Sequence, residues 1–514
     1  MPATNTQRMP QKAWIGGVNT FNSEDSVQPN QAYTLENISI MDRPESIAKI
    51  SGSRRFNQIY RVIGEALTTV IDSLYSYVKL DGTSLQMVAF HDTTGFHLAT
   101  FTSSSVTTIL PAATPYSLAV KDWISFEGVL YFVVGDNFVY KWTGIGTYTR
   151  LAMPIGFNPS IVEMYYGRAF YAGDTSAPNR IYISASLTPS IFNAVADFVD
   201  VLDSIGDGIV ELKTLSDSLI VFKKRSLHQI QGSPPREIRE ISSIGVGAIS
   251  RHTIQKTQLG IIFLSDLGVY TLNGGGELKK ISLNIEPTVN AFLGLTNMNF
   301  SSVYYKNVYY LFYQNATSTF INVGIAFALD SLEFNVLGIT TLNNFHCKSN
   351  IVLTAFQSNN DWLCFKDGTN IVLKMNNSDY PFYYKDEANQ AVGLEANVTS
   401  HWEEFGNPTI IKELRSIWFT TQRPLVDLEY TVEWTRYGVN KSYTKRVVGG
   451  AVSTWNNVNW NAFLWEPANK FLYKIILPGG IQLERCRIKL KSDNANEIFS
   501  LLSYEYHFVS RREI

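Results

Sequence analysis

The feature that most constrains the fold is a hairpin pattern that recurs along the chain. Its clearest copy runs from residue 219 to residue 230. An apolar run at 219–222 (LIVF) turns at Lys223, Lys224 and Arg225, and the chain returns through 227–230 (LHQI). Apolar and polar residues alternate along the return, which is typical of a half-buried antiparallel strand. The chain therefore predicts β-hairpins as its building unit.

Similar hairpins, each turning at Asp, Asn or Gly, occupy residues 85–98, 129–142, 169–181, 261–272, 308–320 and 362–373. The repeat is irregular, at about every 40 to 50 residues, and that period is typical of β-propellers, whose blades are four-stranded sheets. We expect each hairpin to form the middle or outer strand pair of one blade, in a propeller of six or seven blades. An array of β-sandwiches would give a similar number of strands and stays open as an alternative.

The spacing of these patterns divides the chain into three parts. Residues 1–60 are polar and interrupted by prolines, and predict an N-terminal arm with short strands. Residues 61–390 hold the hairpins of the expected propeller. Residues 391–514 have longer strand patterns at looser spacing and predict a C-terminal β-sandwich-like domain. Only residues 190–201 and 285–293 favour a helical turn, so we expect an all-β protein.

Composition excludes several classes of protein. The net charge is −2 and no long run of Lys or Arg occurs, which argues against avid nucleic-acid binding. No apolar run is long enough to span a membrane, and the polar N-terminus does not resemble a signal peptide. The cysteines have no metal-ligand spacing and are expected to be small buried side chains; they are Cys347, Cys364 and Cys486.

No catalytic motif is present, so we expect a protein that is not an enzyme, with no catalytic, cofactor-binding or metal-binding residues. The seven histidines are scattered and are expected to be structural or at the surface. Five aspartates in turns are expected to cap their own backbone; they are Asp136, Asp174, Asp207, Asp266 and Asp367. The triplet Lys223, Lys224 and Arg225 is expected to be a solvated hairpin tip, with contact to a phosphate backbone as the alternative.

One central block of sequence comprises residues 179–184 (NRIYIS), 206–209 (GDGI), 219–223 (LIVFK) and the return at 226–232. This block resembles the tail hub and nozzle proteins of short-tailed bacteriophages, also described as packaged-DNA stabilisation or tail tubular proteins. Residues 244–250 and 263–270 are similar to the next blade of such proteins. A weaker likeness opens the last domain at Trp402, Gly406, Pro408, Lys412 and Arg415.

The resemblance implies a structural virion protein, made in the host cytoplasm and located in the tail. Such proteins form rings, typically hexameric, below the portal and adaptor proteins, with tail fibres or spikes nearby. They extend the DNA channel, help to retain the packaged genome and conduct it at ejection. The near-neutral charge agrees with this role, because many phosphate contacts would slow sliding DNA. Two alternatives stay open: a propeller glycosidase or carbohydrate-binding module acting on host surface polysaccharide, and a propeller binding module outside viruses.

Overall fold

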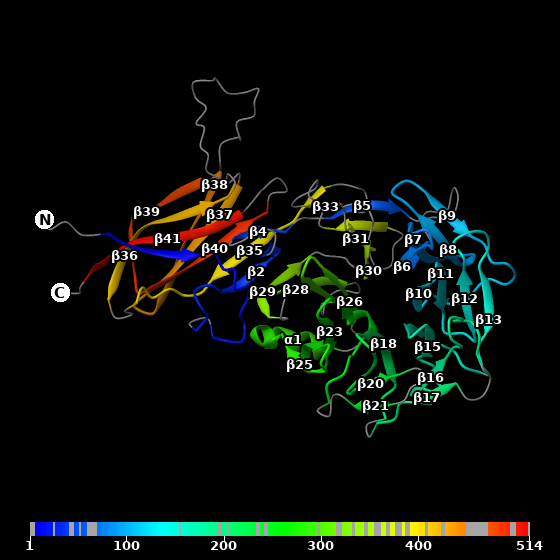
Figure 1. Cartoon of the computed structure of the whole chain (residues 1–514). Coiled ribbons are helices and arrows are strands. Elements are labelled where there is room, and N and C mark those ends of the chain that lie inside the picture. Colours follow the sequence, from blue (N-terminus) through cyan, green and yellow to red (C-terminus); the bar gives the residue numbers. More distant parts are fainter. Residues whose placement is uncertain are drawn as a thin grey trace.

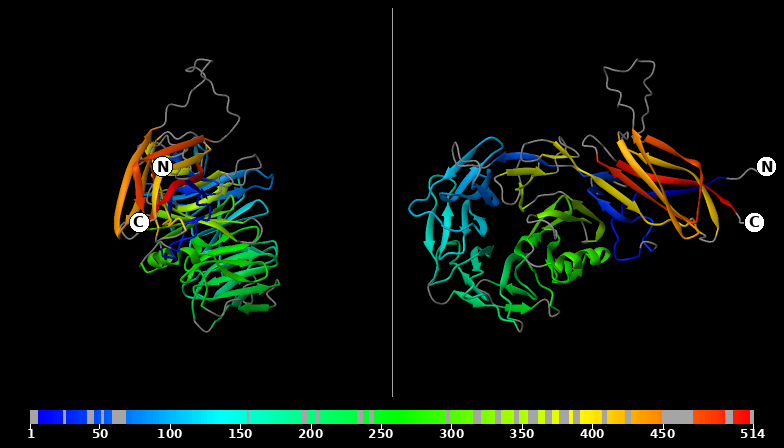
Figure 2. Two further views of the ribbon diagram at one scale, coloured as in Figure 1. Left: turned by 90° about the vertical axis from the view of Figure 1, so that its left-hand side faces the viewer. Right: turned by 180° about the vertical axis from the view of Figure 1, so that it is seen from behind.

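The computed structural model describes residues 6–511, apart from residues 24–25, 41–45, 51–52, 59–68, 155, 193–196, 204–205, 233–236, 241–244, 296–298, 315–320, 331–334, 344–347, 354–360, 366–370, 376–382, 386–390, 407–409, 423–426, 449–470 and 494–499. Within these residues the chain is almost entirely β-structure. A ring of small sheets lies at one end of an elongated molecule, and a pair of long-stranded sheets lies at the other, together with both termini (Figures 1 and 2).

Seven four-stranded antiparallel units form the ring, and we number them as blades in chain order. Blades 1 to 3 contain β6 (Val70–Val78), β7 (Ser84–Asp92), β8 (Gly95–Phe101) and β9 (Val106–Ile109); β10 (Asp122–Phe126), β11 (Val129–Val133), β12 (Phe138–Trp142) and β13 (Thr149–Ala152); and β14 (Ile161–Tyr165), β15 (Arg168–Ala172), β16 (Arg180–Ile183) and β17 (Phe198–Asp200).

Blades 4 to 6 contain β18 (Ile209–Leu215), β19 (Ser218–Lys223), β20 (Leu227–Gln231) and β21 (Glu237–Glu240); β22 (Gln255–Lys256), β23 (Gly260–Ser265), β24 (Gly268–Asn273) and β25 (Leu278–Lys280); and β26 (Phe300–Tyr305), β27 (Val308–Gln314), β28 (Ile321–Leu329) and β29 (Val336–Asn343). The hairpins expected from the sequence are the second and third strands of their blades, as β19 and β20 illustrate. The all-β propeller is thereby confirmed, with seven blades.

Blade 7 is completed by a strand from the N-terminal part of the chain. Its first three strands are β30 (Lys348–Leu353), β31 (Asp361–Phe365) and β32 (Ile371–Met375). Its outer strand is β5 (Ser53–Gln58), which pairs antiparallel with β32 and places Ile371 opposite Gln58. Residues 53–58 therefore belong with the propeller rather than with the arm expected over residues 1–60, and their pairing closes the ring.

The C-terminal part is a β-sandwich-like pair of sheets. The first, here called the β36 sheet, contains β1 (Gln7–Lys12), β3 (Ile38–Ser39), β4 (Ile47–Lys49), β36 (Ile411–Thr421), β39 (Phe471–Leu483) and β41 (Ser500–Arg511). The second, here called the β40 sheet, contains β2 (Ala32–Glu36), β35 (Ala396–Ser400), β37 (Asp427–Arg436), β38 (Val439–Val448) and β40 (Arg485–Ser492). A small hairpin of β33 (Tyr383–Lys385) and β34 (Ala391–Gly393) precedes it.

Backbone pairing joins the propeller to the sandwich. Strand β2 lies between β29 of blade 6 and β35 of the β40 sheet, so these strands form one nine-stranded sheet. Asn37, in the left-handed region at φ 54°, donates a hydrogen bond to the Glu395 carbonyl at 2.7 Å and accepts one from the Asn343 backbone at 2.9 Å. Gly17 crosses β29 so closely that a Cβ there would lie 2.1 Å from the Ile339 nitrogen. The N-terminal segment thus fastens the two parts together.

Helical structure is confined to one α-helix and two 3-10 turns in the described residues. The helical turn expected at 285–293 is present as α1 (Glu286–Leu293), preceded by η2 (Leu283–Ile285), and η1 (Arg251–Thr253) lies before blade 5. The helical turn expected at 190–201 is wrong over its described C-terminal end, because Phe198–Asp200 pairs with β16 as strand β17. Edge pairing at the rim of blade 3 overrides the weak local helical pattern.

One apolar core runs from the sandwich into the propeller. It contains Ile417 and Tyr504 from the β36 sheet, Val432 from the β40 sheet, and Leu264 and Tyr309 from blades 5 and 6. Smaller clusters fill the spaces between the other blades, as expected for sheets that bury both faces against neighbours. The core therefore packs the two parts against each other as well as within themselves.

Candidate functional site

The axis of the propeller carries a cluster of charged side chains, here called the axial cluster. The first strand of each blade is the innermost, and β10, β14 and β18 lie beside one another. These strands and η1 supply Asp122, Glu163, Glu211, Lys213 and Arg251. Glu211 and Lys213 are two residues apart on β18, so their side chains point to the same side of the strand.

Arg251 is the centre of the axial cluster. Its Nη2 lies 2.8 Å from Asp122 Oδ2 and 2.9 Å from Glu211 Oε2, and its Nη1 donates to the Ser160 carbonyl. Asp122 Oδ2 also accepts a hydrogen bond from the Val162 nitrogen at 2.9 Å. The Arg251 guanidinium, which precedes blade 5 in the chain, therefore connects blade 2, blade 4 and Ser160, the residue just before blade 3.

Lys213 and Thr214 extend the axial cluster to Glu163 on blade 3. The Lys213 Nζ lies 3.8 Å from Glu163 Oε2 and 3.6 Å from Glu211 Oε1. Glu163 Oε1 accepts a hydrogen bond from the Thr214 hydroxyl at 2.9 Å. All three carboxylates of the cluster therefore have cationic or hydrogen-bonding partners supplied by neighbouring blades.

The charge states of the axial cluster depend on one another. Burial raises the pKa of the Glu211 carboxyl, while Arg251 and Lys213 oppose that rise. Burial alone would lower the pKa of the Arg251 guanidinium, but Glu211 and Asp122 raise it overall. Removing one partner would leave the others charged and poorly hydrated, which is the costly way to break a buried ion pair. The cluster therefore acts as a brace between blades.

A second buried cluster, here called the Lys223 cluster, joins blades 3 and 4. The Lys223 side chain is 0% exposed, and its Nζ lies 3.1 Å from Asp203 Oδ2 and 2.8 Å from Asn179 Oδ1. Ser226 donates to Asp203 Oδ2 at 2.7 Å, and the Gly206 nitrogen donates to Asp203 Oδ1 at 2.6 Å. The solvated tip expected for Lys223 is therefore wrong, because the loop carrying Asp203 covers it.

The Lys223 cluster also explains the central sequence motif. The four separate stretches of the motif meet around Asp203. Each contributes one residue, namely Asn179, Gly206, Lys223 and Ser226. Burial alone would raise the pKa of Asp203, but Ser226, the Gly206 backbone and Lys223 lower it to about 2. The motif thus marks a structural joint between blades.

The turn aspartates belong to neither cluster, and Asp207 directly follows Gly206 of the Lys223 cluster. Asp136 accepts from the Phe138 nitrogen at 3.1 Å and Asp174 from the Ser176 nitrogen at 2.8 Å, which are the backbone caps expected for Asp in turns. Asp266 accepts instead from the Ser265 hydroxyl. Asp207 lies 4.0 Å from Arg225, whose side chain is 51% exposed. Asp367 lies outside the described residues.

The histidines are dispersed over the molecule, as expected. His91 contacts Asp72 at 2.8 Å and His97 contacts Asp92 at 3.0 Å, both on blade 1. His228 is buried beside Ser226 at 3.1 Å in the Lys223 cluster, and His401 and His507 lie in the sandwich next to Glu403 and Glu505. His252 belongs to η1, and His346 lies outside the described residues. Among the described residues, no three His, Cys, Asp or Glu side chains are grouped to hold a metal ion.

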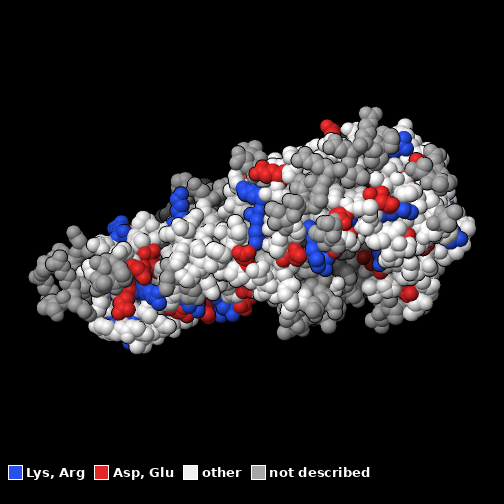
Figure 3. All heavy atoms as spheres, turned by 90° about the horizontal axis from the view of Figure 1, so that it is seen from below, with Lys and Arg blue, Asp and Glu red and all other residues white. Residues whose placement is uncertain are grey.

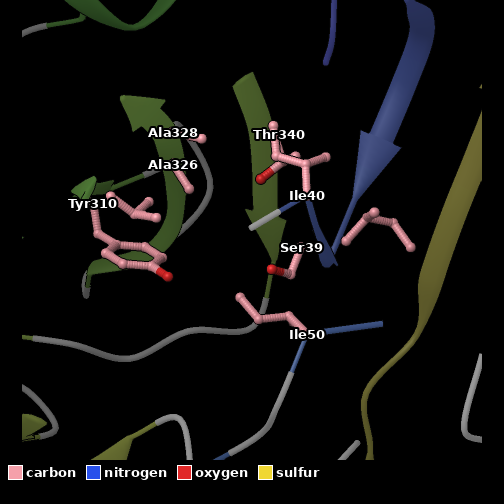
Figure 4. Close-up of a pocket in the computed structure, with 9 residues that line it drawn as sticks. Ser39, Ile40, Ile50, Tyr310, Ala326, Ala328 and Thr340 are labelled. Carbon is pink, nitrogen blue, oxygen red and sulfur yellow. The ribbon is translucent and has the colours of Figure 1, made fainter. Parts of the chain in front are cut away.

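A small hollow lies where the N-terminal segment meets blade 6 (Figure 4). Aliphatic side chains such as Ile38, Ile50 and Ala328 line most of it, with the hydroxyl-bearing Ser39 and Tyr310 beside them. Only about 10 Å³ of it is open to the centre of a water-sized sphere, which is barely enough for one water molecule. We interpret it as a packing gap at the junction.

The surface shown in Figure 3 carries Lys and Arg interspersed with Asp and Glu. That mixture agrees with the net charge of −2. No helix among the described residues is long and apolar enough to cross a membrane. Cys364 and Cys486 are buried, as expected for small apolar side chains, and Cys347 lies outside the described residues.

Sequence analysis missed the axial cluster. Its members come from blades 2, 3 and 4 and from η1, and are up to 129 positions apart, between 122 and 251. The available signal is a charged residue within an otherwise apolar inner strand, as in IVEMY at 161–165 or IVELKTL at 209–215. Such residues are rarely buried without a partner.

Comparisons with known proteins reach only the level of the fold. No protein-family model matches the chain, and no curated protein does. Among solved structures, a streptogramin B lyase is 13% identical over 61% of this chain and 99% of its own, with a TM-score of 0.40. BBS1N in complex with ARL6DN is 10% identical over 63% of this chain and 98% of its own, with a TM-score of 0.40. YCF48 bound to D1 peptide is 10% identical over 66% of this chain and 97% of its own, with a TM-score of 0.38. The sheets themselves define this chain as a seven-bladed β-propeller joined to a β-sandwich-like domain.

Proposed function

We propose that the chain is a structural subunit of a phage tail, a hub or nozzle ring that lies below the portal and adaptor, helps to retain the packaged genome and conducts it at ejection. Six copies would form the ring. Support comes first from the resemblance carried by residues 179–184, 206–209, 219–223 and 226–232. The observation that carries the proposal is that these residues pack into the Lys223 cluster, a buried joint between blades 3 and 4.

The axial cluster supports a structural role for the propeller. Arg251 and Lys213 connect carboxylates on the innermost strands of three adjacent blades, 2, 3 and 4. In a conduit, we expect the DNA channel to lie between copies of the chain, around the symmetry axis of the ring, rather than through a propeller whose inner strands are tied to their neighbours.

The join between the propeller and the sandwich supports a rigid building block. A shared nine-stranded sheet and the hydrogen bonds of Asn37 connect the two parts. Relative motion of domains is the usual expectation unless their interface is large and apolar. A shared sheet and a common apolar core meet that condition, and they suit a subunit that must keep a ring in shape during ejection.

The experiment is imaging of the purified chain by electron microscopy, alone and with co-expressed portal and adaptor proteins. Sixfold rings with a central hole, bound to the adaptor, are the expected result. A companion measurement compares nuclease-accessible DNA in filled heads with and without the chain, and retention is expected only with it. Compact single propellers that never associate, together with heads that keep their DNA without the chain, would refute the proposal.

A propeller glycosidase is the second candidate, because three carboxylates do meet at the axis. Glycosidases use two carboxyl groups flanking the sugar, one of them as acid or base. Here Arg251, Lys213 and Thr214 occupy the three carboxylates, so the tail role is favoured. Release of polysaccharide fragments by the wild type, lost in Glu211→Gln, would reverse that preference.

A further inference from the structure

An amine, a side-chain amide and a carboxylate meet inside the Lys223 cluster. The Lys223 Nζ lies 2.8 Å from Asn179 Oδ1 and 3.1 Å from Asp203 Oδ2. The side chains of Lys223 and Asp203 are 0% and 1% exposed, so water is kept away from the amine and the carboxylate. A nucleophilic amine, an amide carbon and a base are the three groups that the exchange of one amide for another requires.

The Lys223 amine is close to the carbon of the Asn179 amide as well as to its oxygen. A carbonyl bond is about 1.23 Å long, so the Asn179 Cγ lies within about 4.0 Å of Nζ. The last torsion of an asparagine side chain rotates in a broad well, so a small rotation turns the face of Cγ towards the amine. Atoms held about 3–3.5 Å apart are placed for reaction, because no encounter through solvent is needed.

Asp203 is placed to take the proton that Lys223 must lose before it can attack. A general base lies within about 2.6–3.2 Å of the atom that it deprotonates, and Asp203 Oδ2 meets that requirement at 3.1 Å from Nζ. Ser226 donates to the same oxygen at 2.7 Å, and the Gly206 nitrogen donates to Oδ1 at 2.6 Å, which fixes the carboxylate. An amine beside a base that other groups orient is the usual arrangement of an activated nucleophile.

We propose that Lys223 and Asn179 form an isopeptide bond, an amide between their two side chains, within the folded chain. This inference rests on the geometry of the Lys223 cluster and is independent of the proposed tail role. Lys223 passes one proton to Asp203, and the free amine then bonds to Asn179 Cγ. The bond from Cγ to Nδ2 breaks, and Nδ2 leaves with its electron pair. It takes one proton back from Asp203 and one from the attacking nitrogen.

The reaction needs nothing besides these three side chains. One ammonium ion leaves for each bond formed, Asp203 returns to its carboxylate form, and no oxidant or cofactor is consumed. Burial alone would raise the pKa of Asp203, but its hydrogen bonds and Lys223 lower it to about 2. Asp203 is therefore a weak base, and we expect the bond to form slowly compared with folding.

The isopeptide bond would join blades 3 and 4 covalently. Asn179 directly precedes β16 of blade 3, and Lys223 is the last residue of β19 in blade 4. The bond closes a loop between these two positions, and such a loop lowers the entropy of the unfolded chain as a disulfide does. Asp203 keeps its hydrogen bonds from Ser226 and Gly206 after the bond has formed.

A surface pair of the same two residue types provides a comparison within the chain. The Lys279 Nζ lies 2.7 Å from Asn335 Oδ1, as close as in the buried pair, but Lys279 is exposed. Water keeps an exposed ammonium hydrated and lets the long side chain leave its partner. Burial and a fixed base, rather than proximity alone, therefore single out Lys223, and no bond is expected between Lys279 and Asn335.

The test is mass spectrometry of the purified full chain, denatured at intervals after purification. The wild type should become lighter than its sequence by one ammonia molecule. Trypsin should then release residues 169–180 joined to residues 214–224, because it no longer cleaves after Lys223. An asparagine that cyclises by itself loses the same mass, so the joined peptides are the decisive observation.

Variants of the three reacting groups assign their roles. Lys223→Arg keeps the charge but removes the nucleophile, and Asp203→Asn removes the base, so both should keep their full mass and give no joined peptides. Lys224→Arg is the matched control, because Lys224 is the exposed neighbour of Lys223, and it should form the bond like the wild type. Circular dichroism melting curves verify that each variant folds.

The wild-type measurement decides the matter even if a variant fails to fold. A wild type that keeps its full mass and its cleavage after Lys223 through prolonged incubation would overturn the inference. Joined peptides formed as fast in Asp203→Asn as in the wild type would overturn the role of Asp203 as the base. A bond between Lys279 and Asn335 would overturn the argument from burial. None of these results bears on the ring, which imaging tests separately.

Discussion

The propeller and the sandwich join their sheets by different means. Blades 2 to 5 are separate sheets that exchange no ladder hydrogen bonds. Apolar clusters fill the spaces between them, and the axial and Lys223 clusters connect them in addition through charged side chains. The two sheets of the sandwich instead face each other across an apolar core containing Ile417, Val432 and Tyr504. An ion pair requires particular partners at particular distances, whereas apolar contacts depend mainly on volume. We infer that charged clusters add to apolar packing in setting the angular order of these blades, and that apolar packing sets the sandwich.

The largest effect is expected at the propeller axis. Arg251→Ala leaves Asp122 and the buried Glu211 without their guanidinium. Because Arg251 is 19% exposed, we expect the lower end of the range for breaking a buried ion pair, about 3 kcal/mol. Urea unfolding of the purified chain, followed by tryptophan fluorescence, measures the loss. Arg225→Ala, at a half-exposed position, is the control and should change stability by less than about 0.5 kcal/mol.

A double variant sharpens this test. Arg251→Met combined with Glu211→Met removes charge of both signs, so it should recover part of the stability lost in Arg251→Ala. Equal losses in the single and double variants would mean that the axial cluster acts through packing, and the contrast with the sandwich would disappear.

The sandwich should respond to volume. Ile417 is fully buried in its core, and Ile417→Ala should cost about 3 kcal/mol through lost burial and the cavity left behind. Ile417→Leu keeps the volume and should cost less than about 1.5 kcal/mol. The same urea titration measures both. Similar losses for Ala and Leu would show that shape, rather than volume, controls this core.

Acid should weaken the Lys223 cluster. The pKa of Asp203 falls from 3.8 to about 2 in the folded chain, so ionised Asp203 stabilises the fold above pH 4. At about 1.4 kcal/mol per pKa unit, that contribution is about 2 kcal/mol, and it disappears as the pH falls from about 4 to 2. Melting curves over this range should show a weaker pH dependence in Asp203→Asn than in the wild type. An identical dependence in both chains would place the acid sensitivity elsewhere.

A loss of about 2 kcal/mol, similar to that at Asp203, is expected at the junction between the two parts. Asn37→Ala removes two hydrogen bonds, and a substitution of this kind costs about 1 kcal/mol for each group left unsatisfied. Asn37→Gly removes the same bonds but accepts the positive φ without strain, so it should cost less than Asn37→Ala. Differential scanning calorimetry measures both losses. No difference between the two variants would mean that backbone strain at residue 37 contributes nothing.

The sequence predicted the local parts of this fold. Hairpins such as 219–230 are visible because alternation and turn residues lie within a dozen positions, and these hairpins became the middle strands of the blades. The blade period and the change to longer strands in the C-terminal part follow from the same pattern. The inner strands are harder to recognise, because residues such as Glu163 and Lys213 interrupt their apolar runs.

What the sequence could not predict depends on contacts between distant residues. Lys223 looks like a solvated tip until Asp203 and Asn179 are placed around it. The partners of Arg251 lie on other blades, and their meeting is decided by the angle between blades. The pairing of β5 with β32 joins residues more than 300 positions apart, and no local pattern marks it.

The pairing of β5 with β32 also determines when the propeller can close during translation. Residue 58 leaves the ribosome 317 residues before residue 375, and at about 5–20 residues per second that interval lasts roughly 15 to 60 s. During this time blades 1 to 6 can fold in turn, while the strand that completes the seventh has no partner. The nascent chain must keep that strand from pairing elsewhere, and the propeller closes only after most of the chain has been translated.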